Sequence, residues 1–326
     1  MTSARQIIAM IRSHAAGDNE KFLAIAETIA ADAGKSGKSK MADDIRSVIT
    51  DARQSPEPRH TSTPVPITAP RGELAGLVRA SYPETHLSDL VLNNDLARRI
   101  HRAVREHRER DVLQKNGLTP RRKYLFSGPP GTGKGMTAAA VAGELSLPLF
   151  TILLDGVITK FMGETASKLR LVFDSMKNHR GVYFFDEVDA LASRRDADND
   201  IGEARRMLNS FLQFLEDDQS SSVIIAATNH KVLLDPAIFR RFDAAFTYSK
   251  PSAEEAQRVL KFNLSQFKLD HIDWDSVSAG GDGLSQADLV AAAADAARDA
   301  VLDNDGLLTS DILIQAINDR NTIHPD

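Results

Sequence analysis

Four short apolar runs alternate with longer amphipathic stretches in the middle of the chain. The runs are Tyr124–Phe126, Leu147–Leu154, Val182–Phe185 and Val223–Ala227, and each is followed by a polar or glycine-containing turn. Apolar residues at helical spacing come after the first turn, in Met136–Leu145. Uninterrupted apolar runs that alternate with amphipathic helices predict an α/β domain, with a parallel sheet buried between helices.

The first 53 residues have a different pattern. Three short amphipathic helices are predicted there, marked by Ile7, Ile8 and Ile11, by Phe22, Ala26 and Ile29, and by Met41, Ile45, Val48 and Ile49. A segment of about fifty residues buries little apolar surface by itself. Residues 1–53 are therefore either an N-terminal helical module whose core is completed by a partner, or a plain structural appendage.

A proline-rich linker, residues 54–74, separates this module from the rest of the chain. Five prolines lie between Pro56 and Pro70, with serine and threonine among them, and this composition favours a semi-extended conformation. A charged helix, Leu96–Gln114, is predicted on the outside of the central domain because its apolar positions are sparse.

Residues 251–326 are alanine-rich and predict a small helical domain that follows a central domain of residues 75–250. No strand is expected in this part of the chain, and Trp274 is expected to pack under the small domain. The expected helices are Ala253–Gln266, Ser285–Leu302 and Thr309–Asn318.

The turn after the first apolar run carries a phosphate-binding motif. The pattern G-x-x-x-x-G-K is complete between a predicted strand and a predicted helix, which is the context that the motif requires. Glycines let backbone N–H groups close around phosphates, while the helix N-terminus and the lysine add positive charge. We expect a nucleoside triphosphate to bind at Gly128, Pro129, Pro130, Gly131, Thr132, Gly133, Lys134, Gly135 and Met136.

Position 135 departs from this motif. The pattern has Ser or Thr there, whose hydroxyl ligates Mg²⁺, and this chain has Gly135. Thr137 is a poor substitute, because two positions along a helix turn the side chain by about 200°. We expect nucleotide binding to tolerate Gly135, whereas the placement of Mg²⁺ and the rate of hydrolysis stay open.

Polar side chains follow the third and fourth apolar runs. Asp186 and Glu187 come at the predicted C-terminal edge of the sheet, where ligands bind in open α/β folds. Asp186 is suited to hold Mg²⁺ directly or through water, and Glu187 to orient and deprotonate an attacking water. Asn229 ends the next strand, where its amide would either polarise the same water or cap a turn.

Composition narrows the class of protein. The chain of 326 residues has a formal charge of −5 and no basic stripe with aromatic residues, so nucleic acid is not an expected partner. It has no cysteine, which excludes thiol catalysis and disulfides. No signal peptide is visible, and no apolar run approaches the roughly 18 residues of a membrane span. These features predict a soluble, cytoplasmic protein with no membrane contact.

Taken in order, the motifs from about residue 75 onward resemble those of an ATPase of the AAA family. Gly128–Lys134 matches the first nucleotide motif, Phe184–Leu191 the second, and Asn229 the sensor asparagine. Arg240 and Arg241 stand where the family has arginine fingers that reach the γ-phosphate of a neighbouring subunit. The Pro-Gly or similar pair that is usual there is missing, so either arginine is a candidate. The resemblance implies ATP and Mg²⁺ as cofactors.

Two further segments extend the resemblance. Gly283–Leu289 resembles the family's lid signature, which implies that Ala287 contacts the nucleotide, with Gln286 in place of a common glycine. The first pore loop, in which an aromatic residue grips a threaded polypeptide, resembles Lys160, Phe161, Met162 and Gly163. The family then implies a P-loop NTPase fold with a five-stranded parallel sheet between helices, a helical lid, and a homo-oligomeric ring, typically a hexamer, that acts on protein.

The N-terminal helices and the proline-rich linker resemble those of bacterial AAA proteins encoded beside a subtilisin-like protease. This resemblance suggests that the ring presents or remodels protein for a partner protease through residues 1–53. Those residues carry no chemical motif, and a small amphipathic module is able to dock on many surfaces.

Three functions are compared. The leading hypothesis is a protein-remodelling ATPase that pulls on a polypeptide through Phe161. The second is a nucleotide-gated scaffold that binds ATP with little hydrolysis and recruits a partner, as Gly135 would allow; Glu187 and Asn229 argue against it, because a pure binder has no use for water-activating groups. The third, a DNA-acting ATPase, fits poorly with the negative charge.

Overall fold

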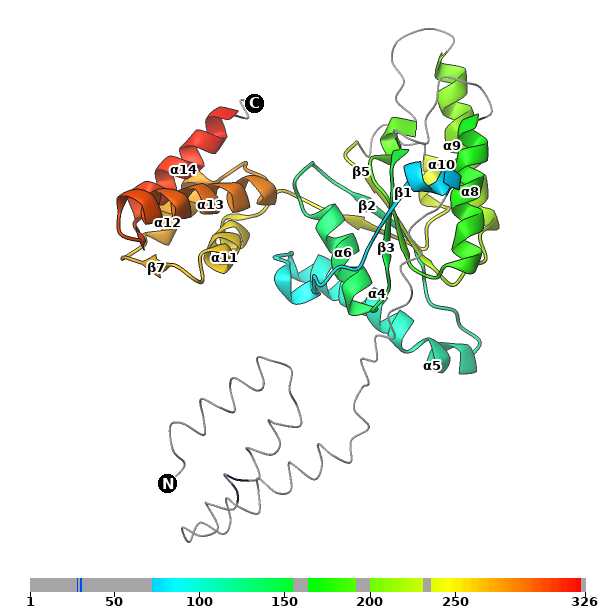
Figure 1. Cartoon of the computed structure of the whole chain (residues 1–326), viewed down its shortest axis with the longest axis horizontal. Helices are drawn as coiled ribbons and strands as arrows, with labels where there is room; N and C mark the ends of the chain where they lie inside the picture. The colour runs from blue at the N-terminus through cyan, green and yellow to red at the C-terminus, as the bar shows by residue number, and fades with distance from the viewer. Residues whose placement is uncertain are drawn as a thin grey trace. The chain divides into compact units, whose positions relative to one another are not determined.

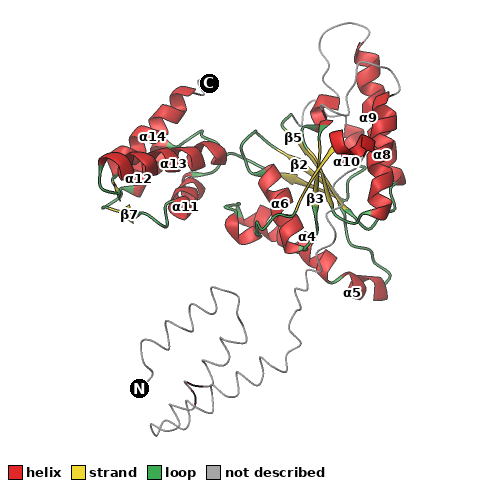
Figure 2. Ribbon diagram, in the orientation of Figure 1, coloured by secondary structure: helices red, strands yellow, loops and turns green. Residues whose placement is uncertain are grey.

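The computed structural model describes residues 28, 30, 72–154, 164–191, 200–230 and 236–323. The described residues from 72 onward belong to one compact unit, which comprises an α/β domain and a smaller helical domain (Figures 1 and 2). The predicted N-terminal module apart from Thr28 and Ala30, most of the predicted linker, and Lys160–Gly163 lie outside the described residues.

The centre of the α/β domain is a six-stranded sheet with the strand order β1-β3-β4-β5-β2-β6. Five neighbouring strands are parallel, which confirms the predicted parallel sheet, and β1 pairs antiparallel with β3 at one edge. The strands are β1 (Val78–Ser81), β2 (Lys123–Ser127), β3 (Leu149–Ile152), β4 (Val182–Phe185), β5 (Val223–Thr228) and β6 (Ala244–Thr247).

The five parallel strands agree with the five-stranded parallel sheet that the family resemblance implied, and β1 adds a sixth, antiparallel strand at the edge. β1 has only four residues and buries fully only the first of them, so its sequence has no apolar run. β6 is the fifth parallel strand, and its short Ala-Ala-Phe-Thr sequence is equally weak as a pattern. An edge strand has a neighbouring strand on one side only and is less buried than a central strand. Its sequence therefore lacks the continuous apolar run that marks a strand buried on both faces.

Helices cover both faces of the sheet (Figure 1). The side chains of adjacent strand residues point to opposite faces, so Phe185 and Ile224 belong to one core and Phe184 and Ile225 to the other. The first core lies under α8 (Glu164–Asn178) and α9 (Asp200–Asp217), and the second under α4 (Asn94–Arg108) and α6 (Lys134–Glu144).

The predicted helix Leu96–Gln114 is two helices rather than one. α4 ends at Arg108, and α5 (Arg110–Lys115) begins after Glu109, whose backbone leaves the helical conformation at φ −98° and ψ 24°. No glycine or proline marks this break, so no residue pattern predicts it. The short elements are three 3₁₀ turns and one helix, Gly72–Gly76, Leu87–Asp89, Val188–Leu191 and α10 (Pro236–Phe239).

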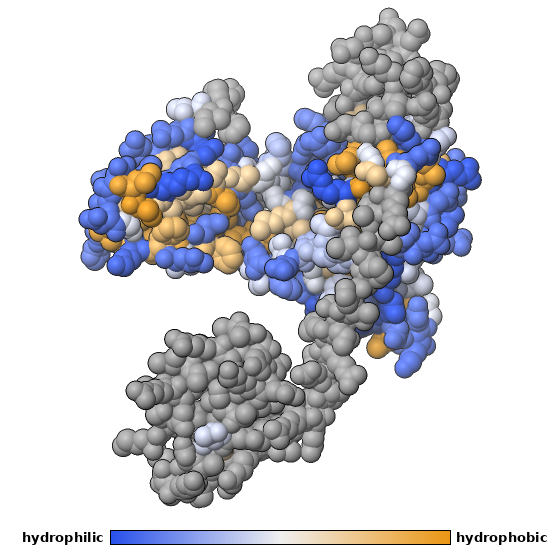
Figure 3. All heavy atoms as spheres, in the orientation of Figure 1, coloured by the Kyte–Doolittle hydropathy of each residue, from blue (hydrophilic) through white to orange (hydrophobic). Residues whose placement is uncertain are grey.

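The helical domain has its own apolar core, formed by four helices. They are α11 (Ala253–Asn263), α12 (Trp274–Gly280), α13 (Gln286–Asp303) and α14 (Ser310–Ile323). Trp274 packs against this core, and Lys261 Nζ lies 4.8 Å above its ring. Figure 3 shows that apolar side chains also remain at the surface of this domain.

The expectation of no strand in the helical domain was wrong. β7 (Lys268–Leu269) pairs in parallel with β8 (Leu307–Leu308). Each strand has two residues, which is too short for any periodic pattern. No helix in the described part of the chain has the length and apolar character needed to cross a membrane.

Candidate nucleotide site

The loop between β2 and α6 has room for no side chain at two of its glycines. A Cβ on Gly128 would stand 2.3 Å from the carbonyl oxygen of Tyr248, and one on Gly131 would stand 2.4 Å from Ser285 Oγ. Gly133 is the residue before α6 and has φ 90°, in the left-handed region that favours glycine. The loop therefore needs glycine to pass between its neighbours and to turn its N–H groups toward the helix N-terminus.

Lys134 is buried within the curve of this loop, with 7% of the residue exposed. Its ammonium donates to the carbonyl oxygens of Gly128 (2.7 Å) and Pro129 (2.8 Å) and to Oδ1 of Asn229 (2.8 Å). Burial lowers the pKa of Lys134, and the nearby carboxylates of Asp186, Asp189 and Glu187 oppose that shift. A lysine held in this way directs its positive charge at the mouth of the loop.

Two carboxylates leave the C-terminal end of β4 beside this lysine. The backbone N–H of Glu187 donates to Asp186 Oδ1 at 3.0 Å, and Glu187 has φ 52°, a left-handed conformation that is uncommon for a residue with a side chain. Burial is the largest cause of a raised pKa for Asp186, and the Glu187 N–H and Lys134 oppose it. The side chain of Glu187 is exposed at the strand end.

Asp189 connects the ends of β4 and β5. It is buried, and its Oδ1 accepts a hydrogen bond from the backbone N–H of Asn229 at 3.3 Å. Asn229 in turn accepts from Lys134. The structure thus brings Lys134, Asp186, Glu187 and Asn229 together at one edge of the sheet. The sequence showed Asp189 as a third carboxylate of the motif but gave no reason to assign it this positioning contact.

Position 135 has room for the side chain that the motif usually has. A Cβ on Gly135 would lie 3.7 Å from the ring of Phe184, which is an ordinary contact. Thr137 does not replace the missing hydroxyl, because it is fully buried and its Oγ1 donates to the carbonyl oxygen of Gly133 at 2.9 Å. Asp186 is therefore the residue near the loop whose oxygens fit a hard cation such as Mg²⁺.

The helical domain contacts the loop directly. The backbone N–H of Ala287 donates to the carbonyl oxygen of Gly131 at 3.0 Å, and Gln286 Nε2 donates to the carbonyl oxygen of Val91 at 2.6 Å. Ser285 caps α13 and packs against Gly131. The family resemblance predicted that Ala287 lies at the nucleotide site. The contacts of Ser285 with Gly131 and of Tyr248 with Gly128 arise only in the folded chain and were not predicted.

Arg240 and Arg241 differ in their surroundings although both are exposed. Arg241 forms an ion pair with Glu216 of α9. Arg240 has no ion pair or hydrogen bond to another residue in the described part of the chain. Met136, in the first turn of α6, is half exposed beside the loop.

Comparison with known proteins agrees with this arrangement. The model of the ATPase family associated with various cellular activities (AAA) matches residues 124–249, from β2 to the segment after β6. An uncharacterized AAA family ATPase, y4kL of Sinorhizobium fredii, is 36% identical over 275 residues, which cover 84% of this chain and 82% of that protein. The chain belongs to the AAA family of ATPases. The matched region of this AAA protein contains both the phosphate loop and the carboxylates at the end of β4.

Other relatives are longer than this chain. The ATP-dependent zinc metalloprotease FtsH 3 of Sphaerobacter thermophilus is 32% identical over 228 residues, 68% of this chain and 47% of that protein. A proteasome-activating nucleotidase of Methanococcus maripaludis is 32% identical over 216 residues, 64% of this chain and 53% of that protein. This AAA protein spans about half the length of these two relatives. The crystal structure of the FIGL-1 AAA domain has the same fold, with a TM-score of 0.60, 23% identity, and coverage of 74% of this chain and 85% of that one.

Proposed function

We propose that this protein binds ATP with Mg²⁺ at the loop Gly128–Met136 and hydrolyses it. The observation that carries the proposal is the convergence of Lys134, Asn229 and the Asp186–Glu187 pair at the C-terminal edge of the sheet, joined by the 2.8 Å bond from Lys134 to Asn229. A phosphate loop alone binds nucleotide, whereas a carboxylate and an amide beside it are the groups that hydrolysis needs.

Each residue then has a distinct task. ATP would supply the phosphoanhydride bond that is broken, and bound Mg²⁺ would neutralise the negative charge of its phosphates. Lys134 donates to phosphate oxygens, and Asp186 holds the cation directly or through water. Glu187, exposed at the strand end, orients water and takes its proton, and the Asn229 amide fixes the same water. Ala287 and Met136 lie beside the loop on the lid and on α6.

Arg240 is the better candidate for an arginine finger. Its guanidinium is exposed and is not engaged by a described residue of its own chain, whereas Arg241 is paired with Glu216. A finger acts on the nucleotide of a neighbouring subunit, so it must be free to leave its own surface. This assignment requires a ring of identical subunits, which we propose to be a hexamer.

The work of the ring is proposed to be the remodelling or unfolding of protein. This AAA protein resembles an ATP-dependent zinc metalloprotease over 228 residues and a proteasome-activating nucleotidase over 216 residues. In this proposal residues 75–250 bind nucleotide, 251–326 form the lid, Lys160–Gly163 engage a polypeptide in the pore, and residues 1–53 hold a partner such as a protease at the end of the linker 54–74.

The test is ATP-dependent unfolding of a fluorescent protein that carries an unstructured tag, followed by loss of fluorescence. Phe161→Ala is expected to abolish unfolding and to leave ATP hydrolysis within about twofold of the unmodified rate, because the aromatic grip is separate from the chemistry. Phe161→Tyr is the matched control and should keep both activities. Equal loss of hydrolysis and unfolding in Phe161→Ala would contradict a pore role.

A further inference from the structure

A cavity of about 520 Å³ lies at the other edge of the sheet, where the parallel strands begin. Ligands of open α/β folds bind at the C-terminal edge, and the nucleotide site described above is there. This second cavity is therefore separate from it. Its walls come from His107 of α4, from α5 and from the starts of four strands, namely 119–122 and Lys123 for β2, Arg180 before β4, 219–221 before β5 and Asp243 before β6.

Positive charge dominates these walls. Five cationic side chains line the cavity, against the one carboxylate of Asp243; they are Arg110, Arg121, Arg122, Lys123 and Arg180. Asp243 is already engaged, because its Oδ2 accepts from the backbone N–H groups of Arg122 (2.8 Å) and Lys123 (2.9 Å).

Carboxylates outside the cavity pair with two of these arginines. Glu106 binds Arg121, and the buried Asp218 binds Arg122. No described carboxylate pairs with Arg180 in the same way.

This pairing leaves Arg110, Arg180 and Lys123, and the ammonium of Lys123 donates to the backbone carbonyl oxygen of Leu215. Arg180 has no hydrogen bond or ion pair to any residue in the described ranges, and Arg110 has only a 3.5 Å contact with its exposed neighbour Asp111. The two guanidiniums act on each other, since burial first and then the charge of Arg110 lower the pKa of Arg180. Two like charges that share a cavity are stabilised by an anion bound between them.

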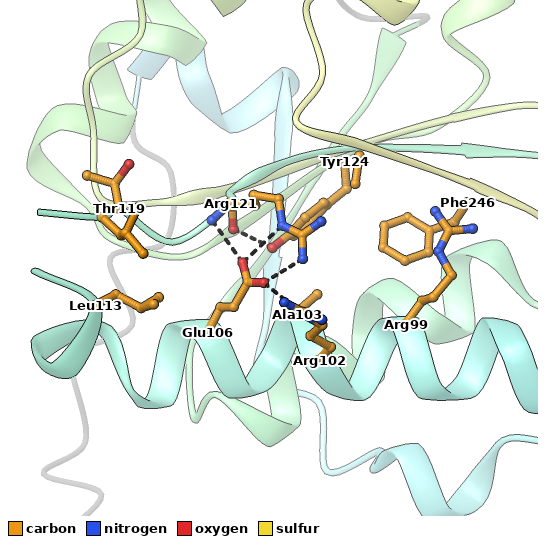
Figure 4. A pocket seen from close by; sticks show the side chains of 11 residues that line it. Arg99, Arg102, Ala103, Glu106, Leu113, Thr119, Arg121, Tyr124 and Phe246 are labelled. Carbon is orange, nitrogen blue, oxygen red and sulfur yellow. Dashed lines mark hydrogen bonds and ion pairs between the residues drawn. The ribbon is translucent and has the colours of Figure 1, made fainter. Parts of the chain in front are cut away.

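A neighbouring cavity of about 530 Å³ shows the contrast (Figure 4). It also contains arginines, but Glu106 lies between two of them: it accepts a hydrogen bond from Arg121 Nε and forms a 3.6 Å ion pair with Arg102. Arg99 is held over the ring of Phe246, 4.9 Å from its centroid, and donates to the carbonyl oxygen of Ala245. Its cations are thus engaged by described residues, whereas in the second cavity Arg180 has no described partner and Arg110 has only the 3.5 Å contact with Asp111.

Neutral donors complete the second cavity. Ser221, Gln219, Thr119 and Gln114 line it and bring hydroxyl and amide groups to the same space as the guanidiniums. Guanidinium groups with hydroxyl and amide donors are the set that binds phosphate oxygens. The one ring among its described wall residues is His107, which is buried and hydrogen-bonded to the carbonyl oxygen of Arg121, so the described walls offer no exposed ring on which nucleic acid bases stack.

We propose that this cavity is a second anion site, which binds a small, multiply charged oxyanion of the di- or triphosphate class through Arg110 and Arg180. Its size falls within the range of small-molecule pockets. Because it lies at the edge opposite the nucleotide loop, it does not depend on Lys134 and is not a part of the hydrolytic site.

The test uses the full-length Lys134→Ala protein, in which the phosphate loop is disabled, and inorganic tripolyphosphate as the probe. Binding is measured by isothermal titration calorimetry before and after adding Arg180→Ala or Arg110→Ala. Each added substitution is expected to lower the affinity at least tenfold. Arg98→Ala is the matched control, because Arg98 is an exposed arginine of α4 that pairs with Asp95 outside this cavity, and it should change the affinity less than twofold.

Three results would overturn the proposal. Tripolyphosphate binding that vanishes with Lys134→Ala alone would belong to the phosphate loop. Binding that survives both Arg110→Ala and Arg180→Ala would lie elsewhere. Tighter, Arg180-dependent binding of a single-stranded oligonucleotide than of tripolyphosphate would make the ligand a nucleic acid. Thermal unfolding of each variant shows that the surface substitutions leave the fold intact.

Discussion

Lys134 and Asn229 are joined by a 2.8 Å hydrogen bond from Nζ to Oδ1, although 95 positions separate them in the chain. The bond ties the phosphate loop after β2 to the end of β5. Asp189 holds Asn229 from the other side through its backbone N–H. The side-chain oxygen of Asn229 is therefore committed to the lysine, and its Nδ2 has no hydrogen bond to a residue in the described part of the chain.

This arrangement predicts that two substitutions of Asn229 differ. Asn229→Asp keeps an oxygen acceptor for Lys134 and loses the Nδ2 donor, so hydrolysis should fall about 10²-fold while ATP affinity stays near normal. Asn229→Ala loses both groups and should weaken ATP binding as well. The measurements are steady-state hydrolysis and titration with a fluorescent ATP analogue. Equal ATP affinity in the two variants would contradict the role given to the Lys134 contact.

The two arginines predict another asymmetry. Arg240→Ala should lower hydrolysis by about 10³-fold or more, the range found for arginine fingers, because Arg240 alone is free to reach a neighbour. Arg241→Ala, its matched control, loses an exposed ion pair with Glu216, and such pairs contribute little. Mixing Arg240→Ala subunits with Glu187→Gln subunits should restore part of the activity. No restoration would argue against a finger acting between subunits.

Gly135 predicts a gain of function. Gly135→Thr fits the space beside Phe184 and supplies a hydroxyl near the cation. We expect it to lower the Mg²⁺ concentration needed for half-maximal hydrolysis. The shift is about threefold if the hydroxyl contributes about 0.7 kcal/mol to the free energy of Mg²⁺ binding. Gly135→Ala adds the Cβ without the hydroxyl and serves as the control. An equal shift in both variants would mean that helix propensity, not metal ligation, is the cause.

Asp186 predicts a dependence of stability on pH. Burial raises its pKa in the folded protein above the unfolded value of about 3.9. The folded state then binds the proton more tightly, so the contribution of Asp186 to the free energy of unfolding falls as pH rises through the window between the two pKa values. Without nucleotide, Asp186→Asn should be more stable than the unmodified protein at neutral pH.

The same gain should disappear toward pH of about 3, below the unfolded pKa, where Asp186 is protonated in both states. Urea unfolding at the two pH values measures the difference, and Asp299→Asn on the exposed surface of α13 controls for the change in net charge. A gain that is independent of pH would show that the carboxylate charge of Asp186 is not its cause.

The sequence predicted the parts of the fold whose burial is complete. β2, β4 and β5 are covered on both faces, so their apolar runs are continuous and easily recognised. β1 and β6 lie at the edges, and β7 and β8 have two residues each, so no comparable run exists. The break between α4 and α5 at Glu109 has no glycine or proline to mark it in the sequence.

The candidate site divides in the same way. Gly128–Lys134, Asp186 and Glu187 are adjacent to strand ends in sequence, and their convergence follows from the parallel sheet. The contact of Ala287 with Gly131 and the pairing of Arg241 with Glu216 depend on how distant elements pack. Likewise, Arg110 and Arg180 line one cavity because the strand order places β2 and β4 on either side of β5.

The central claim, ATP hydrolysis by the set around Lys134, is tested most directly by Mg²⁺-dependent phosphate release from the purified protein beside Glu187→Gln. The account predicts turnover by the unmodified protein, and at least a 10²-fold loss in Glu187→Gln with ATP binding retained. A protein that binds ATP but releases no phosphate above the rate of Glu187→Gln would contradict it and would favour a nucleotide-gated scaffold.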